Sequence, residues 1–216
     1  MNLLIVAATD TEIGPLIGHL QNTPARQGLK EDLLITGVGM LAAAWSLTKH
    51  LQSKKYDLVI QAGVAGSYDR DIPLGEVVFV TGDQYGDMGA EDHDNYLDIF
   101  EMGLIDKNTM PHTDGILTTP LLPIHEKISL RQVTGITVNT VSGNERTIKL
   151  RSGKYGCVAE SMEGAAFHYV CLQENVPFAQ IRAISNYVTP RDKSQWKMKE
   201  AIINLNNWLI DFIDNI

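Results

Sequence analysis

The sequence is poor in residues that build disulfide or metal frameworks. Only two cysteines occur among 216 residues, Cys157 and Cys171, and neither belongs to a C-x-x-C pair. We expect both to be reduced core thiols in a protein of a reducing compartment. The six histidines lack a metal-ligand spacing such as H-x-x-x-H, so we expect no metal and no cofactor.

Long apolar runs and blocks of like charge are also missing. No apolar stretch approaches the roughly 20 residues that span a bilayer. The run at 3–8 is too short for a signal peptide and is followed at once by Asp10 and Glu12. The net charge of −8 includes no basic cluster, which argues against nucleic acid or an anionic membrane as partner. We therefore expect a cytoplasmic protein that acts on a small molecule.

Strand-like and helix-like segments alternate along the chain. Apolar runs predict strands at 3–8, 33–36, 57–63, 76–81, 136–141, 157–159 and 177–185. Helical spacing predicts helices at 11–20, 40–51, 163–172 and 194–216. This order predicts one α/β domain over residues 1–216, with helices on both faces of the sheet. The polar, proline-containing segment 84–132 is expected to be a long excursion from it.

Glycines close three of the predicted strands, in the segments 37–39, 63–66 and 142–143. Each alone is most simply a tight turn. Together they favour a ligand site, because ligands of open α/β sheets bind at the carboxyl ends of strands, where glycine lets the backbone approach closely. G-V-G-M-L-A at 37–42 also matches a dinucleotide fingerprint, but Asp57, the acid at the required spacing, begins its strand and would lie at the wrong edge. A nicotinamide enzyme is therefore a weak alternative.

Two acids interrupt the apolar stretch V-A-E-S-M-E-G-A-A at 158–166. Glu163 falls at a predicted strand-to-helix junction, on the ligand edge of the sheet. A carboxylate there gains up to about 1 kcal/mol from the helix dipole, and Ser161 and Glu160 suit capping as well. From the residues alone, capping and catalysis are equally favoured.

Several segments, in matching order, are similar to one known group of enzymes. They are M-E-G-A-A (162–166), V-P-F-A-Q-I-R-A-I-S-N (176–186), G-V-G-M-L-A-A-A (37–44), Q-A-G-V-A-G-S (61–67) and V-S-G-N (141–144). This pattern resembles the nucleoside phosphorylase and nucleosidase superfamily. The resemblance implies a three-layer α/β/α sandwich around a mixed, mostly parallel sheet, assembled as a homodimer or larger homo-oligomer. A-E-S-M-E-G-A-A, G-D-M-G-A-E (86–91) and I-S-N look most like the branch that hydrolyses futalosine in menaquinone biosynthesis.

The resemblance also implies roles for single residues. Glu163 would bind the ribose hydroxyls and stabilise positive charge as the sugar becomes oxocarbenium-like. Met162 would pack its thioether against the ribose, with core filling as the alternative. Glu12 would be the general base that activates water, with a solvated surface charge as the alternative. Gly63, Val64 and Ser142, at the glycine segments, would contact the substrate.

Two residues depart from the pattern of nucleosidases that act on adenine-type bases. Asn186 stands where those enzymes have an aspartate. An asparagine cannot protonate a leaving base, but its amide matches a 6-oxo group beside a protonated ring nitrogen, so it predicts a hypoxanthine-like base. The alternative is a plain turn residue. Arg146 would stack on the purine or meet a distal carboxylate of the substrate, or it is simply solvated.

Phosphate is not expected to be the nucleophile. Phosphorylases of the superfamily need arginines after the first strand and before the glycine segment of the third. Here the first arginine is Arg26, beyond the first predicted helix, and the second position is Gln61. The expected activity is hydrolysis of a purine nucleoside. The alternatives are a methylthioadenosine-type nucleosidase, a purine nucleoside phosphorylase and, from another class, a nucleoside-binding module without turnover.

Overall fold

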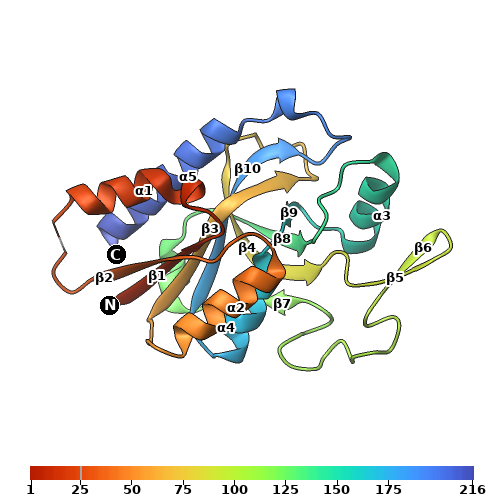
Figure 1. Ribbon diagram of the computed structural model, residues 1–216, viewed down its shortest axis with the longest axis horizontal. Coiled ribbons are helices and arrows are strands. Elements are labelled where there is room, and N and C mark those ends of the chain that lie inside the picture. The colour runs from red at the N-terminus through yellow and green to blue at the C-terminus, as the bar shows by residue number, and fades with distance from the viewer. Residues whose placement is uncertain (25) are drawn as a thin grey trace.

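A mixed eight-stranded sheet forms the middle layer of the computed structural model, which describes residues 1–24 and 26–216 (Figure 1). Its strands are β1 (Asn2–Ala7), β2 (Lys30–Ile35), β3 (Leu58–Ser67), β4 (Val77–Tyr85), β7 (Leu117–Thr118), β8 (Arg131–Thr137), β9 (Ala159–Ser161) and β10 (Phe178–Tyr187). The pairings β3–β10–β4–β8–β9–β3 close into a ring, and β1 and β2 extend from β3. Most pairs are parallel, whereas β10–β4, β3–β9 and β4–β7 are antiparallel.

Helices cover both faces of this sheet. In Figure 1, α1 (Asp10–Asn22) and α5 (Met198–Asn215) lie on one side, and α2 (Met40–Leu51) and α4 (Gly164–Gln173) lie on the other. The short 3₁₀ helices are η1 (Pro123–Lys127) and η2 (Lys193–Gln195). The predicted α/β fold class, a three-layer arrangement around a mixed sheet, is confirmed. No helix in the described ranges combines the length and apolarity needed to cross a membrane.

The first strand shows why an unbroken apolar run predicts a strand covered on both faces. Leu3 and Ile5 belong to the core beneath α1 and α5. Leu4 and Val6, which alternate with them, belong to the core beneath α2 and α4. Side chains alternate across a strand, so all four positions must be apolar when helices cover both faces.

The structure corrects the bounds of two predicted strands and adds a helix. The third predicted strand does not end at Gly63, because β3 continues to Ser67. The fifth was predicted at 136–141, but β8 ends at Thr137 and a loop follows to Asn144. The helix α3 (Glu145–Tyr155) was not predicted at all; Arg151 is its only buried residue, so it lacks an apolar stripe.

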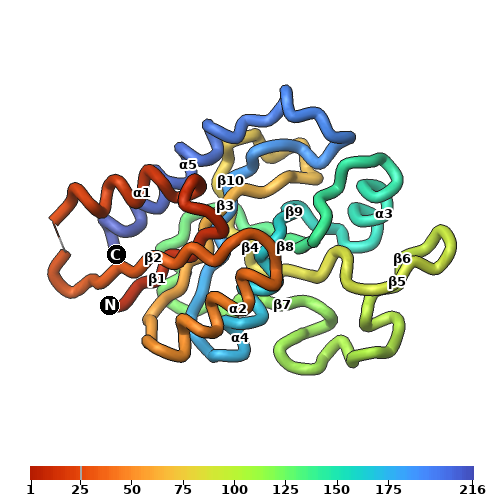
Figure 2. The backbone as a smooth tube through the Cα atoms, in the orientation of Figure 1, coloured from red at the N-terminus to blue at the C-terminus, as the bar shows by residue number. Residues whose placement is uncertain are grey.

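The predicted excursion between β4 and β8 contains a hairpin of its own. Strands β5 (Gly89–Asp92) and β6 (Asn95–Asp98) pair with each other and not with the main sheet. Figure 2 shows this part of the chain reaching away from the layers, beside α3. Lys154 on α3 ties the two together by bonding the Tyr96 carbonyl at 3.4 Å and Asp98 at 3.0 Å.

Candidate active site

A hollow of about 410 Å³ opens at the carboxyl ends of β1, β3, β9 and β10. Five of the predicted site residues line it: Glu12, Val64, Met162, Glu163 and Asn186. They come from four separate parts of the chain, which the strands bring to one edge of the sheet. This is the edge where open α/β sheets bind ligands.

Glu12 lies in the first turn of α1 and faces two neighbours. Its Oε2 accepts hydrogen bonds from the Thr9 backbone at 3.1 Å and the Thr9 hydroxyl at 3.2 Å, which forms a capping box. Its Oε1 accepts from the Val64 backbone at 3.1 Å. The helix cap therefore fixes the orientation of the carboxylate, and one acid can serve both as a cap and as a base at the hollow.

Gly63 acts by leaving room rather than by lining the hollow. A Cβ built at this position would lie 2.4 Å from Arg182 Nη1 and 2.8 Å from Glu12 Oε1. Any side chain would push these two groups apart. The glycine segment was predicted as a turn, but its glycine serves close approach of charged side chains to a strand.

Glu163 stands immediately before α4, at the predicted strand-to-helix junction. Its Oε1 accepts from the Gly39 backbone at 2.9 Å, and its Oε2 lies 3.9 Å from Arg182 Nη1. Gly39 has a φ of +93°, a conformation that favours glycine, so the glycine segment 37–39 helps to hold this acid. Glu163 is 5% exposed, and the neighbouring Met162 is partly buried against the same hollow.

Arg182 is the site residue that sequence reasoning missed. It is 1% exposed in the middle of β10, and its Nη2 donates to Gln61 Oε1 at 2.8 Å. Its charge lies beneath both Glu163 and Gly63. The available signal was an arginine inside the mostly apolar F-A-Q-I-R-A-I, since a buried charge normally has a specific partner.

Asn186 lines a side branch of the hollow, a space of about 60 Å³. Its Oδ1 accepts from the Ser185 hydroxyl at 2.8 Å, and its Nδ2 donates to the Tyr187 carbonyl at 3.1 Å. These bonds orient the amide and leave one N–H and one acceptor position for a ligand. Ser142 lines this branch too, but its hydroxyl already contacts Glu160 at 2.6 Å, so a direct bond from this hydroxyl to substrate is not favoured.

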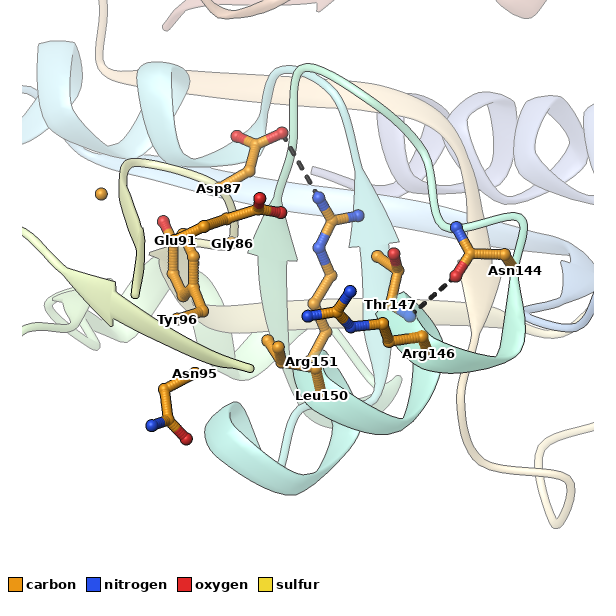
Figure 3. A pocket seen from close by; sticks show the side chains of 11 residues that line it. Gly86, Asp87, Glu91, Asn95, Tyr96, Asn144, Arg146, Thr147, Leu150 and Arg151 are labelled. Carbon is orange, nitrogen blue, oxygen red and sulfur yellow. Dashed lines mark hydrogen bonds and ion pairs between the residues drawn. The ribbon is translucent and has the colours of Figure 1, made fainter. Parts of the chain in front are cut away.

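Arg146 is not brought together with the other predicted residues. It lines a separate hollow of about 480 Å³ between α3 and the β5–β6 hairpin (Figure 3). Its side chain is 67% exposed and bonds the His93 carbonyl at 3.3 Å and Asp94 at 3.2 Å. Of the three roles expected for Arg146, a solvated side chain fits this position, whereas stacking on a base in the other hollow does not.

The buried carboxyl group of Asp83 is linked through Thr137 to the first turn of α4, which directly follows Glu163. The Thr137 hydroxyl donates to Asp83 at 2.9 Å and accepts from the Ala165 backbone at 2.7 Å, which anchors the first turn of α4. Burial raises the pKa of the Asp83 carboxyl to about 6. Burial also lowers the pKa of His168, deeper in α4, to about 4. Within residues 1–24 and 26–216, no three His, Cys, Asp or Glu side chains gather as a metal site.

Comparison with known proteins places this geometry in a family. The model of the phosphorylase superfamily matches residues 2–214. A futalosine hydrolase of Streptomyces coelicolor is 33% identical over 183 residues, which cover 82% of this chain and 75% of that protein.

Solved structures agree on the fold. Futalosine hydrolase of Helicobacter pylori superposes with a TM-score of 0.80 at 14% identity, covering 100% of this chain and 98% of that one. A methylthioadenosine/adenosylhomocysteine nucleosidase of Neisseria meningitidis gives the same TM-score at 18% identity, covering 100% and 99%. The fold therefore does not distinguish these two activities. The resemblance found in the sequence is confirmed: this chain belongs to the phosphorylase superfamily.

Proposed function

We propose that this protein hydrolyses the N-glycosidic bond of futalosine, releasing hypoxanthine and leaving dehypoxanthine futalosine. The observation that carries the proposal is the convergence of two carboxylates, Glu12 and Glu163, on one hollow whose side branch is lined by Asn186. The 33% sequence identity to a futalosine hydrolase, over 82% of this chain, supports the choice of substrate.

Glu163 is the residue that stabilises the ribose in the transition state. Cleavage of the C1′–N9 bond leaves positive charge on the ribose ring, and a carboxylate interacts with that charge more strongly in the transition state than with the neutral substrate. Arg182, 3.9 Å from Glu163 Oε2, and the Gly39 amide fix the carboxylate before substrate arrives. Met162 supplies the apolar contact beside it.

Glu12 is the general base that activates the attacking water. A water bound to its carboxylate attacks C1′ and gives a proton to the carboxylate, while the electron pair of the breaking bond moves onto the base. The leaving purine takes up a proton from solvent and Glu12 returns its proton to solvent, so the net reaction is the addition of one water across the C1′–N9 bond. Val64 N–H and Thr9 already hold the Glu12 carboxylate before the substrate binds. The general base is therefore positioned without a further loss of side-chain entropy.

Hydrolysis is favoured over phosphorolysis by the placement of arginines. Arg26 pairs with Glu31 at 2.9 Å, and Gln61 is bonded to Arg182. Arg191 does line the hollow, but it stacks on Trp196 at 5.2 Å, toward the side branch. A phosphate at the water position would instead face the carboxylate of Glu12, which disfavours an anion there.

The proposal is tested by incubating the protein with futalosine, inosine and methylthioadenosine, with and without phosphate, and measuring release of free base by chromatography. We expect hypoxanthine from futalosine at a rate that does not depend on phosphate. Phosphate-dependent release would establish a phosphorylase, and faster release from methylthioadenosine would establish the other nucleosidase. Binding without release would establish a module without turnover.

Assembly into a homodimer or larger homo-oligomer remains a prediction. Leu41 and Trp45 on α2 are 86% and 65% exposed, which is unusual for such large apolar side chains. Light scattering on the purified protein measures the assembly directly. A monomer at micromolar concentration would contradict the prediction.

A further inference from the structure

We propose that Glu160 sets the base specificity of this site: its carboxylate accepts the N1–H of a 6-oxopurine while Asn186 donates to the 6-oxo group. The choice of a purine as ligand rests on the proposed function. Glu160 lines both the main hollow and its side branch, together with Asn186.

Glu160 and Asn186 lie on the two strands that pair with β3 at Gly66. Glu160 on β9 is directly paired with Gly66 on β3, and Gly66 is paired with Asn186 on β10. Paired residues on neighbouring strands project to the same face of a sheet, and strands two apart are about 10 Å apart. A Cβ built on Gly66 would lie 3.1 Å from Asn186 Nδ2, so the missing side chain lets the Asn186 amide lie over β3, on the side of Glu160. The two groups can therefore meet neighbouring atoms of one base, its N1–H and its 6-oxo group.

The remaining hydrogen-bonding capacity of Glu160 is that of an acceptor. Its Oε2 accepts from the Tyr68 hydroxyl at 2.6 Å and the Ser142 hydroxyl at 2.6 Å. Its Oε1 accepts from the Ser142 backbone at 2.8 Å. A carboxylate oxygen has two acceptor positions, so Oε1 keeps one for a ligand.

The Glu160 carboxylate discriminates between purine bases more strictly than the Asn186 amide. The Asn186 amide keeps both one N–H and one acceptor position for a ligand, so Asn186 alone can accommodate a 6-oxo or a 6-amino base. An ionised carboxylate can only accept. Hypoxanthine presents a donor at N1, whereas adenine presents an acceptor there, which would oppose Glu160 without a proton between them. An acceptor facing an acceptor is the arrangement that lets a site reject an analogue strongly.

A structural role for Glu160 is the competing explanation. Arg151 lies 3.5 Å from Glu160 and 3.5 Å from Asp87, and Asp87 accepts from the Asn139 backbone at 2.7 Å. Both acids therefore hold the loop between β8 and α3. Only Glu160 lines the nucleoside hollow, so Asp87 provides a matched control for loop anchoring.

The test compares binding of free hypoxanthine and free adenine by calorimetry in the wild type, Glu160→Gln and Asp87→Asn. We expect the wild type to prefer hypoxanthine, and Glu160→Gln to reduce the preference at least tenfold, because its amide can donate to N1 of adenine. Asp87→Asn should change both dissociation constants by the same factor. Equal changes for the two bases in Glu160→Gln would overturn the proposal and leave only loop anchoring.

A second probe needs no variant. 1-Methylhypoxanthine lacks the N1–H, and we expect the wild type to bind it at least tenfold more weakly than 7-methylhypoxanthine, which has a methyl group of the same size but keeps N1–H. Equal binding of these two bases would overturn the proposal even if Glu160→Gln does not fold. Base binding requires no turnover, so failure to hydrolyse futalosine would remove the proposed function without affecting this result.

Discussion

The two large hollows of the molecule differ in how their charged groups are used. The hollow beside α3 is the larger, at about 480 Å³ against about 410 Å³, and it is lined by Asp87, Glu91, Arg146 and Arg151. Its two arginines have partners in the same region: Arg151 pairs with Asp87 (Figure 3), and Arg146 pairs with Asp94 of the hairpin.

The hollow at the strand ends is smaller but better suited to chemistry. Its carboxylates, Glu12 and Glu163, are held mainly by backbone N–H groups from other elements, and they converge on a space lined mostly by apolar surface. Fixed charges in such surroundings act more strongly than charges exposed to water. Size alone would select the wrong hollow, whereas convergent, preorganised acids select the one at the strand ends.

The largest expected effect is at Glu12. In Glu12→Gln the amide oxygen can still cap α1, but the general base is lost, so kcat for futalosine should fall by about 10²–10⁴-fold. Hypoxanthine should bind as in the wild type, because Glu12 does not line the side branch. Steady-state kinetics and calorimetry measure the two quantities. Retained turnover would assign the activation of water to another group.

A somewhat smaller loss is expected at Glu163. Glu163→Gln keeps an acceptor for the Gly39 amide but removes the negative charge beside the ribose. We expect kcat/KM to fall by about 10²–10³-fold, with most of the loss in kcat, since the charge matters chiefly in the transition state. A loss confined to KM would show that Glu163 only binds the ground-state sugar.

Asn186→Asp sharpens the comparison at the base end of the same hollow. A carboxylic acid can protonate a leaving adenine-type base, so the ratio of kcat/KM for adenosine to that for inosine should rise about tenfold. Kinetics with the two nucleosides measure this ratio. An unchanged ratio would show that Asn186 does not recognise the base.

The parts of this molecule that the sequence predicts are those whose signal is local. The apolar run 3–8 predicts β1, and the pattern at 40–51 predicts α2 with the observed bounds. The helix α3 was missed because its surroundings are solvent and the hairpin, so no apolar stripe is required.

The site was predictable only where one residue type carries a recognisable pattern. Glu12, Met162, Glu163 and Asn186 follow from motifs, and the structure places them around one hollow. Arg182 and Glu160 act through partners such as Gln61, 121 residues away, and Ser142, 18 residues away. Such pairs exist only after the strands are in register, so a short segment can indicate that a charge is buried but not which residue it pairs with.

The buried Asp83 carboxyl should change how the free energy of unfolding depends on pH. The pKa of Asp83 is raised to about 6, so its protonated form stabilises the fold below pH 4, and that contribution is lost as pH rises to 6. His168, with its pKa lowered to about 4, has the opposite effect: stability is lost as pH falls from 6.5 to 4. The two contributions largely cancel in the wild type.

Asp83→Asn removes one of the two opposing contributions. Relative to the wild type, the variant should therefore gain unfolding free energy between pH 4 and pH 7, by up to about 3 kcal/mol. Urea denaturation at several pH values measures this difference. A difference that stays constant with pH would show that Asp83 does not titrate in this range.

The smallest effect is expected in the hollow beside α3, and it tests the other half of the comparison. Arg146 is 67% exposed and its ion pair with Asp94 lies in solvent, where such pairs contribute about 0–1 kcal/mol. Arg146→Ala should change kcat/KM for futalosine less than twofold, and the melting temperature by no more than a few degrees. If kcat/KM instead fell tenfold or more for futalosine but not for inosine, the group that distinguishes the two substrates would reach Arg146. The two hollows would then be parts of one substrate site, with the larger one receiving the distal end of the nucleoside.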